Sequence, residues 1–160
     1  MNYKPIIIVN GEPNSIFLEI FFKSIKTKKF KSPLILICSK KLLLKNMKKF
    51  KFKKKIKILK SMFYDYKDLN NDFINIIDVK YNQKNNIRET NEYIKKSFKV
   101  GFDMINKNIS NKFINGPISK ARFLNKKYLG ITEYIAKEFS IQRNAMLIFN
   151  KKLSVCPLTT

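Results

Sequence analysis

Short apolar runs alternate with amphipathic stretches along most of this chain. The first two runs, residues 4–9 and 34–38, are dominated by Ile, Leu and Val, as is typical of buried strands in a parallel sheet. A turn and then apolar residues at helical spacing follow each run, which predicts one helix from Ser15 to Ile25 and another after Ser39. Both serines are predicted N-caps. The chain therefore opens with two strand, turn, helix units.

The same alternation continues downstream. Strands are predicted at residues 55–59, 73–79, 113–114, 145–149 and 153–158, and helices over 90–105, from 119 onward and over 132–139. Thr90 and Thr132 are the predicted N-caps of the long helix and the last helix. The strand at 145–149 is expected to be buried, and the last two strands to form an antiparallel hairpin. This order favours an α/β fold with a mostly parallel, doubly wound sheet.

Three turns, at residues 10–15, 115–120 and 130–133, are candidates for a site, because ligands in such sheets gather beyond the carboxyl ends of the strands. At 115–120 a glycine permits close backbone approach, a helix start offers free N–H groups, and Lys120 offers a cation. This combination suits an anionic or phosphorylated substrate. The alternative is that Gly116 and Pro117 only turn the chain, that Lys120 is solvated, and that Thr132 serves only its helix start.

The high net charge does not change the predicted fold or the candidate site. The formal net charge is +23, and clustered lysines would attract nucleic acid or an anionic membrane surface. Here the lysines are spread through the chain, and in residues 48–57 they alternate with apolar residues, as in a half-buried strand or a surface of snorkelling side chains. We therefore predict no nucleic-acid and no membrane partner, and keep a basic nucleic-acid-binding protein as an alternative. The opening apolar run is too short for a signal peptide or a membrane span, which predicts a cytoplasmic protein.

Candidate chemistry is sparse. The chain has no His, which removes the commonest metal ligand and the commonest general base near neutral pH. Cys38 and Cys156 lie far apart in apolar surroundings and are predicted to be buried structural thiols. Because no P-loop and no GxGxxG motif is present, the residues that bind a cofactor stay unassigned. The residues alone thus predict an α/β domain with an anion-binding edge as its candidate site.

Four segments carry motifs in a recognisable order. They are Gly11-Glu12-Pro13 with Ile16 and Glu19, Asn115-Gly116-Pro117-Ile118-Ser119-Lys120, Gly130-Ile131-Thr132-Glu133-Tyr134-Ile135-Ala136, and the run from Leu153 to Thr160. Together they resemble the 4-hydroxythreonine-4-phosphate dehydrogenase family of vitamin B6 biosynthesis. The family shows a Gly-Glu/Asp-Pro turn, a Gly-Pro-x-x-Lys loop, a Gly-His-Thr-Glu-Tyr-Leu-Ala segment, and a strand that continues into Thr-Thr-His.

The resemblance implies a three-layer α/β/α fold with a mostly parallel sheet, like that of isocitrate and isopropylmalate dehydrogenases. It also implies two domains, with the active site between them and completed by the partner subunit of a homodimer. Residues 1–160 are then expected to be the N-terminal part of a two-domain dehydrogenase, incomplete at the C-terminus, with no internal boundary assigned.

The implied activity is an NAD- or NADP-dependent oxidation of 4-hydroxy-L-threonine phosphate in pyridoxal 5'-phosphate biosynthesis. The product is a 3-oxo acid that loses carbon dioxide and yields 3-amino-2-oxopropyl phosphate. A divalent metal such as Zn, Mg or Co assists, and its ligands are expected beyond Thr160. This chain alone is therefore expected to be inactive. The alternative is the same fold acting on another phosphorylated hydroxy acid.

The resemblance also implies roles for individual residues. Thr132 matches a substrate-binding Thr of the family, and Lys120 matches an active-site Lys for which a proton-transfer or electrostatic role is expected. Ile131 stands where the family has a substrate-binding His, and its aliphatic side chain cannot form a hydrogen bond. Residues 14–18 also depart from the family, which has small, glycine-containing residues there.

Overall fold

The computed structural model of this chain describes residues 3–59, 69–82, 86–124 and 127–157. The chain divides into two compact units, Met1–Ile118 and Ser119–Thr160. Most of the polar stretch at residues 61–71 lies outside the described residues, as do residues 158–160 at the end of the last predicted strand.

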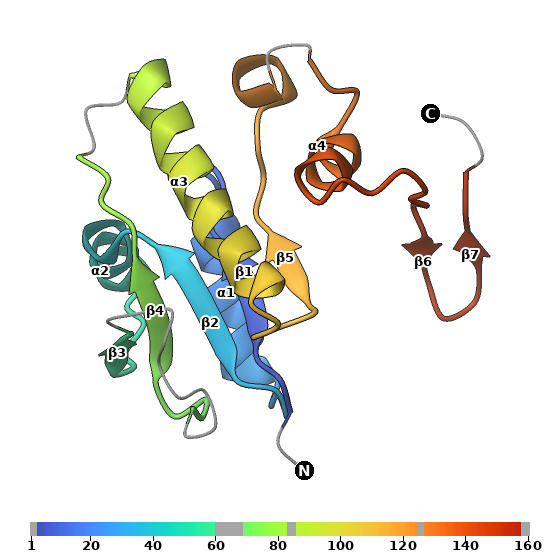
Figure 1. The fold of residues 1–160 in the computed structure, drawn as a ribbon. Helices are drawn as coiled ribbons and strands as arrows, with labels where there is room; N and C mark the ends of the chain where they lie inside the picture. Colours follow the sequence, from blue (N-terminus) through green and yellow to red (C-terminus); the bar gives the residue numbers. More distant parts are fainter. Residues whose placement is uncertain (1–2, 60–68, 83–85, 125–126, 158–160) are drawn as a thin grey trace. The chain divides into compact units, whose positions relative to one another are not determined.

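The first unit is built on a five-stranded parallel sheet (Figure 1). Its strands, in chain order, are β1 (Ile6–Val9), β2 (Leu34–Cys38), β3 (Ile56–Ile58), β4 (Ile74–Asp78) and β5 (Phe113–Asn115), and they lie side by side in the order β3-β4-β2-β1-β5. Val9 pairs with Ile37 of β2 and with Asn115 of β5, so the carboxyl ends of these strands are level. The predicted parallel α/β sheet is therefore confirmed.

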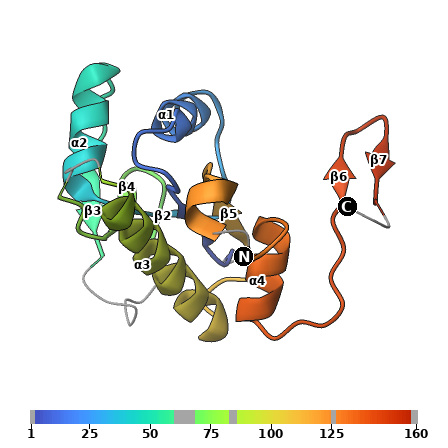
Figure 2. The same ribbon diagram turned by 90° about the horizontal axis from the view of Figure 1, so that it is seen from above.

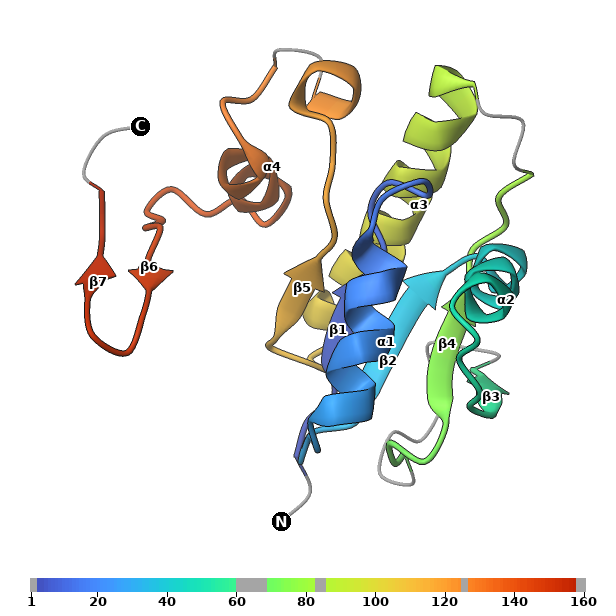
Figure 3. The same cartoon turned by 180° about the vertical axis from the view of Figure 1, so that it is seen from behind.

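Helices cover both faces of this sheet. The helices α1 (Phe17–Thr27) and α2 (Lys40–Lys49) lie on one face and α3 (Ile87–Asn106) on the other, which gives the expected three layers (Figures 2 and 3). On the α1 and α2 side, Leu36, Leu43 and Ile76 are completely buried. On the α3 side, Ile94 and Phe98 are completely buried. Burial of these apolar side chains supplies most of the driving force for folding.

Two predicted helix starts are corrected by the cap geometry. Helix α1 begins at Phe17, with Ile16 rather than Ser15 at its N-cap position. Ser15 lies in the preceding turn, where its hydroxyl donates to the Glu12 carbonyl at 2.8 Å and accepts from the Phe17 N–H at 3.4 Å. Helix α3 begins before Thr90, because the Asn86 side chain accepts from the Glu89 N–H at 2.6 Å and caps the helix one turn earlier.

The cap at Ser39 is confirmed, since its hydroxyl accepts from the Leu42 N–H. The lysine-rich run at 48–57 is not one strand. Helix α2 ends at Lys49, the chain turns through Lys51 with a φ of 50°, and β3 starts only at Ile56. The ring of Phe52 in this turn stacks on Phe22 of α1 with centroids 4.6 Å apart.

The second unit holds the π-helix η2 (Lys120–Leu124), the helix α4 (Ile131–Glu138) and an antiparallel hairpin of β6 (Ile148–Phe149) and β7 (Ser154–Val155). The predicted hairpin is present, but the prediction that its first strand is buried is wrong, since Leu147 is 62% and Phe149 72% exposed. Only two residues of each strand take part in the pairing, so the apolar character of these strands does not indicate that they belong to a core. Cys156 is likewise exposed rather than buried.

Gly130, not Thr132, is the N-cap of α4, and it provides no side-chain hydrogen bond. No helix in the described parts of the chain is long and apolar enough to cross a membrane.

Candidate functional site

The turns that follow β1 and β5 lie side by side, because these strands are parallel neighbours in the sheet. The Gly116 N–H donates to the Val9 carbonyl at 2.8 Å, and the Glu12 N–H donates to the Pro117 carbonyl at 2.8 Å. Two of the three candidate turns therefore form one joint structure at the carboxyl edge of the sheet.

Both glycines in these turns are required by close backbone packing. Gly11 has a φ of +72°, and a Cβ atom there would lie 2.4 Å from the Pro117 carbonyl oxygen. A Cβ atom at Gly116 would lie 2.0 Å from the Asn10 carbonyl oxygen. The space at Gly116 that the sequence assigned to a ligand is thus filled by the neighbouring turn. The absence of a side chain at Gly11 and Gly116 therefore allows these two turns to pack against each other.

A buried hydroxyl lies beneath the same edge. The Tyr93 oxygen accepts the Ser39 N–H at 3.2 Å and so links α3 to the end of β2. Burial raises the pKa of Tyr93 well above its ordinary value, and the neighbouring Cys38 adds to this, while hydrogen bonds from surrounding groups oppose it. Burial, and then Asp78, also raise the pKa of the Cys38 thiol. Both groups are therefore neutral and structural at physiological pH.

The N-terminus of α2 is also at this edge, but two of its donors are already used. The Lys40 N–H donates to the Asp78 carboxylate at 2.8 Å, and the Leu42 N–H donates to the Ser39 hydroxyl at 3.4 Å. A phosphate group would have to displace a carboxylate of the same sign. This helix start therefore does not fit the pyrophosphate of a dinucleotide, and cofactor-binding residues remain unassigned.

The predicted site residues Lys120, Ile131 and Thr132 all belong to the second unit. Lys120 begins η2 and its side chain is exposed. Ile131 and Thr132 are the first two residues of α4 and are both half-buried. Glu133 folds back over the helix start, where its carboxylate oxygen would lie 3.0 Å from a Cβ atom at Gly130. The first turn of α4 thus presents Thr132 next to an acidic side chain.

Aromatic rings connect the segment that carries Lys120 to the helix that carries Thr132. Phe123 of η2 meets Tyr134 of α4 edge to face, with centroids 5.5 Å apart, and Tyr128 meets the same ring at 5.4 Å. Burial, followed by the neighbouring Glu138 and Tyr128, raises the pKa of Tyr134 to about 12. Sequence reasoning did not single out these three aromatics, although Tyr134 lies within one of the four motifs.

The described residues contain no group of three or more Cys, Asp or Glu side chains placed to hold a metal ion. The described residues therefore supply no complete metal site of their own.

Comparison with known proteins identifies one matching family. The family profile described as "Pyridoxal phosphate biosynthetic protein PdxA" matches residues 29–160, a range that excludes the turn at Gly11. No curated protein matches the chain.

Solved structures resemble the fold closely at low sequence identity. The 4-hydroxythreonine-4-phosphate dehydrogenase from Klebsiella pneumoniae is 17% identical with a TM-score of 0.78, and covers 96% of this chain and 50% of its own. The enzyme of the same name from Burkholderia phymatum is 18% identical with a TM-score of 0.75, covering 97% of this chain and 49% of its own. This chain therefore spans about half the length of these structures.

Proposed function

This chain belongs to the PdxA family, and on that premise we propose that it forms part of a dehydrogenase of pyridoxal phosphate biosynthesis. Its substrate is 4-hydroxy-L-threonine phosphate, whose secondary alcohol loses a hydride to NAD or NADP and a proton to a base. The resulting 3-oxo acid releases carbon dioxide and gives 3-amino-2-oxopropyl phosphate. The observation that carries this proposal is the family match over residues 29–160, which includes Lys120, Ile131 and Thr132.

Thr132 holds the substrate in this proposal. Its hydroxyl can both donate and accept a hydrogen bond, and it lies in the first turn of α4, where backbone N–H groups have no partner within the helix. These donors and the positive end of the helix dipole favour an anionic group of the substrate, which would replace the Glu133 carboxylate that folds back over this helix start.

Lys120 supplies the positive charge. Its exposed ammonium group lies at the start of η2, and the Phe123–Tyr134 contact joins η2 to α4 within the same unit. A cation at this place stabilises negative charge that develops on the alcohol oxygen, or exchanges a proton with it.

We further propose that the complete protein is a cytoplasmic homodimer that uses a divalent metal, Zn, Mg or Co. When bound, the metal acts as a Lewis acid toward the alcohol. Its ligands are expected beyond Thr160.

The test is a coupled assay of the complete natural protein, which follows reduced nicotinamide with the substrate, each cofactor and added metal. Thr132→Val is expected to raise KM by roughly tenfold, the loss of about one hydrogen bond to a charged group. Lys120→Met is expected to lower kcat by about a hundredfold or more. Lys137→Met, an exposed lysine on α4, is the matched control and should leave both constants unchanged. Absence of turnover by a folded, metal-loaded dimer would refute the proposed reaction.

A second candidate function is oxidation of another phosphorylated hydroxy acid. The observation that favours it is Ile131, which is half-buried beside Thr132 and cannot form a hydrogen bond to the substrate. In this case Ile131→His would increase kcat/KM for 4-hydroxythreonine phosphate, while the unaltered protein would prefer a substrate lacking the polar group that His contacts.

A further inference from the structure

The opposite end of the sheet from the candidate turns contains a pocket of about 570 Å³. Its lining includes the segment between α1 and β2, the residue pair Pro33 and Leu34 at the start of β2, and Phe73 just before β4. We call it the amino-edge pocket, because it lies where these strands begin. Its volume is within the range of about 300–1,000 Å³ that small-molecule sites occupy.

The charge around this pocket is strongly positive. Among the described residues that line it, four are lysines, Lys28, Lys29, Lys31 and Lys54, and one is a carboxylate, Asp72, so these residues together have a net charge of +3. The ion pairs formed between described residues are all within helices, Glu19–Lys23, Arg88–Glu92 and Lys99–Asp103, and none includes a lysine of the pocket. Lys54 is also half-buried, so part of its side chain already lies in the wall of the pocket.

Aromatic surface lies beside these charges. Phe30 is 38% and Phe73 36% exposed, and both rings line the pocket together with the buried side chain of Phe21. Exposed rings next to lysines suit a ligand with an aromatic part, because a planar ring stacks on a phenyl group while its phosphates meet the ammonium groups.

The segment that carries Phe30 and Lys31 is held in place by Asn71. The Asn71 side-chain oxygen accepts from the Leu34 N–H at 2.9 Å, and its nitrogen donates to the carbonyls of Phe30 at 3.0 Å and Ser32 at 2.9 Å. One side chain thus fixes this wall of the pocket to the start of β2. A wall fixed before binding lowers the entropy cost of holding a ligand.

We propose that the amino-edge pocket binds an aromatic phosphate with at least two negative charges, of the nucleotide class. The ring lies against Phe30 and Phe73, and the phosphates lie among Lys28, Lys31 and Lys54. The site is distinct from the turns after β1 and β5, since those turns follow the carboxyl ends of the strands.

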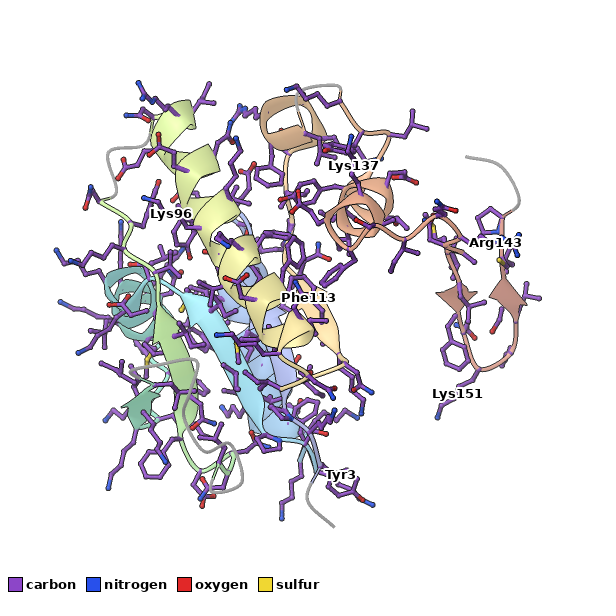
Figure 4. The ribbon with its side chains drawn as sticks, viewed as in Figure 1. Tyr3, Lys96, Phe113, Lys137, Arg143 and Lys151 are labelled. Atoms are coloured by element: carbon purple, nitrogen blue, oxygen red, sulfur yellow. The ribbon has the colours of Figure 1, made fainter. Side chains whose placement is uncertain are left out.

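The test is calorimetric titration of this chain with guanosine 5′-triphosphate, chosen because it lacks the adenosine of NAD. Lys28→Glu/Lys31→Glu is compared with Lys95→Glu/Lys96→Glu, which makes the same change in net charge on exposed lysines of α3 (Figure 4 labels Lys96). Saturable binding is expected, weakened at least about tenfold by the first pair and less than about threefold by the second.

Inorganic triphosphate and guanosine separate the two parts of the ligand. Both are expected to bind more weakly than the nucleotide, and Phe73→Ala should weaken binding of the nucleotide but not of inorganic triphosphate. Circular dichroism checks that each variant is folded. Equal losses with the two charge-reversed pairs, or equal affinity for nucleotide and inorganic triphosphate, would mean diffuse attraction to a basic surface and would overturn the proposal. Absence of binding would overturn it as well.

Discussion

Replacing Gly116 by Ala tests whether the two turns at the carboxyl edge form one structure. The added Cβ atom would lie 2.0 Å from the Asn10 carbonyl oxygen, 2.7 Å from the Asn10 carbonyl carbon and 2.9 Å from the Phe17 ring. Two of these three atoms are backbone, so no side-chain rotation can relieve the overlap. The turn after β5 must therefore move away from the turn after β1.

This movement breaks the hydrogen bonds that connect the two turns, and the number of broken bonds determines how much stability is lost. They run from Gly116 to Val9 and from Glu12 to Pro117, both at 2.8 Å. Breaking both, together with the strain of overpacking, is expected to lower the free energy of unfolding by roughly 3 to 5 kcal/mol. That is a large part of the total stability of about 5–15 kcal/mol that is usual for a domain.

Gly101→Ala provides the matched comparison, since it adds the same methyl group within the same unit. Its Cβ atom meets side chains only, the nearest being the Phe113 ring at 2.6 Å, and Ala is favoured over Gly in a helix by about 1 kcal/mol. Denaturant unfolding followed by circular dichroism should therefore show a clearly larger loss of stability for Gly116→Ala. Equal midpoints for the two variants would refute the joint role of the turns.

Three further predictions concern buried and exposed side chains. Tyr93→Phe leaves the Ser39 N–H buried without its partner and should cost about 1–3 kcal/mol in denaturant unfolding. A thiol reagent should label Cys156 alone in the folded chain and Cys38 only after unfolding, so Cys156→Ser should show no labelling when folded. The pKa of Tyr134 is raised from 10 to about 12, so folding favours the neutral phenol, and the contribution of Tyr134 to stability should fall as pH rises from 10 to 12. Tyr134→Phe should remove this pH-dependent loss of stability and also remove a phenolate absorbance step near pH 12.

The parallel sheet could be predicted because its strands are apolar on both faces. Ile35, Leu36 and Ile37 are each completely buried, so the run between Pro33 and Ser39 indicated a central strand without any knowledge of its neighbours. The order of the strands could not be predicted in the same way. It places β5 next to β1 although more than one hundred residues separate them, and short strands such as Phe113–Asn115 carry too little pattern to specify a partner.

Helix starts were harder to predict, because several residues compete for each cap. Ser15, Thr90 and Thr132 are all good caps in isolation, yet Ile16, Asn86 and Gly130 hold the N-cap positions. At α3, Asn86 caps one turn before Thr90 and thereby includes Thr90 within the helix. The hairpin shows a different limit of prediction from sequence. Its apolar residues predicted a buried strand, whereas Phe149 is exposed.

The residues of the candidate site fall into two groups. The packing of the fold explains the first group and does not explain the second. Gly11 and Gly116 belong to two of the motifs, but their packing against each other accounts for both glycines without any ligand. A glycine that a fold requires is weak evidence for a binding site. Lys120 and Thr132 are different, because the fold of the second unit does not require an exposed ammonium group at the start of η2, and because Gly130, not Thr132, caps α4. It follows that substitutions at these two positions should alter activity with little effect on stability, whereas substitutions at the glycines should do the reverse.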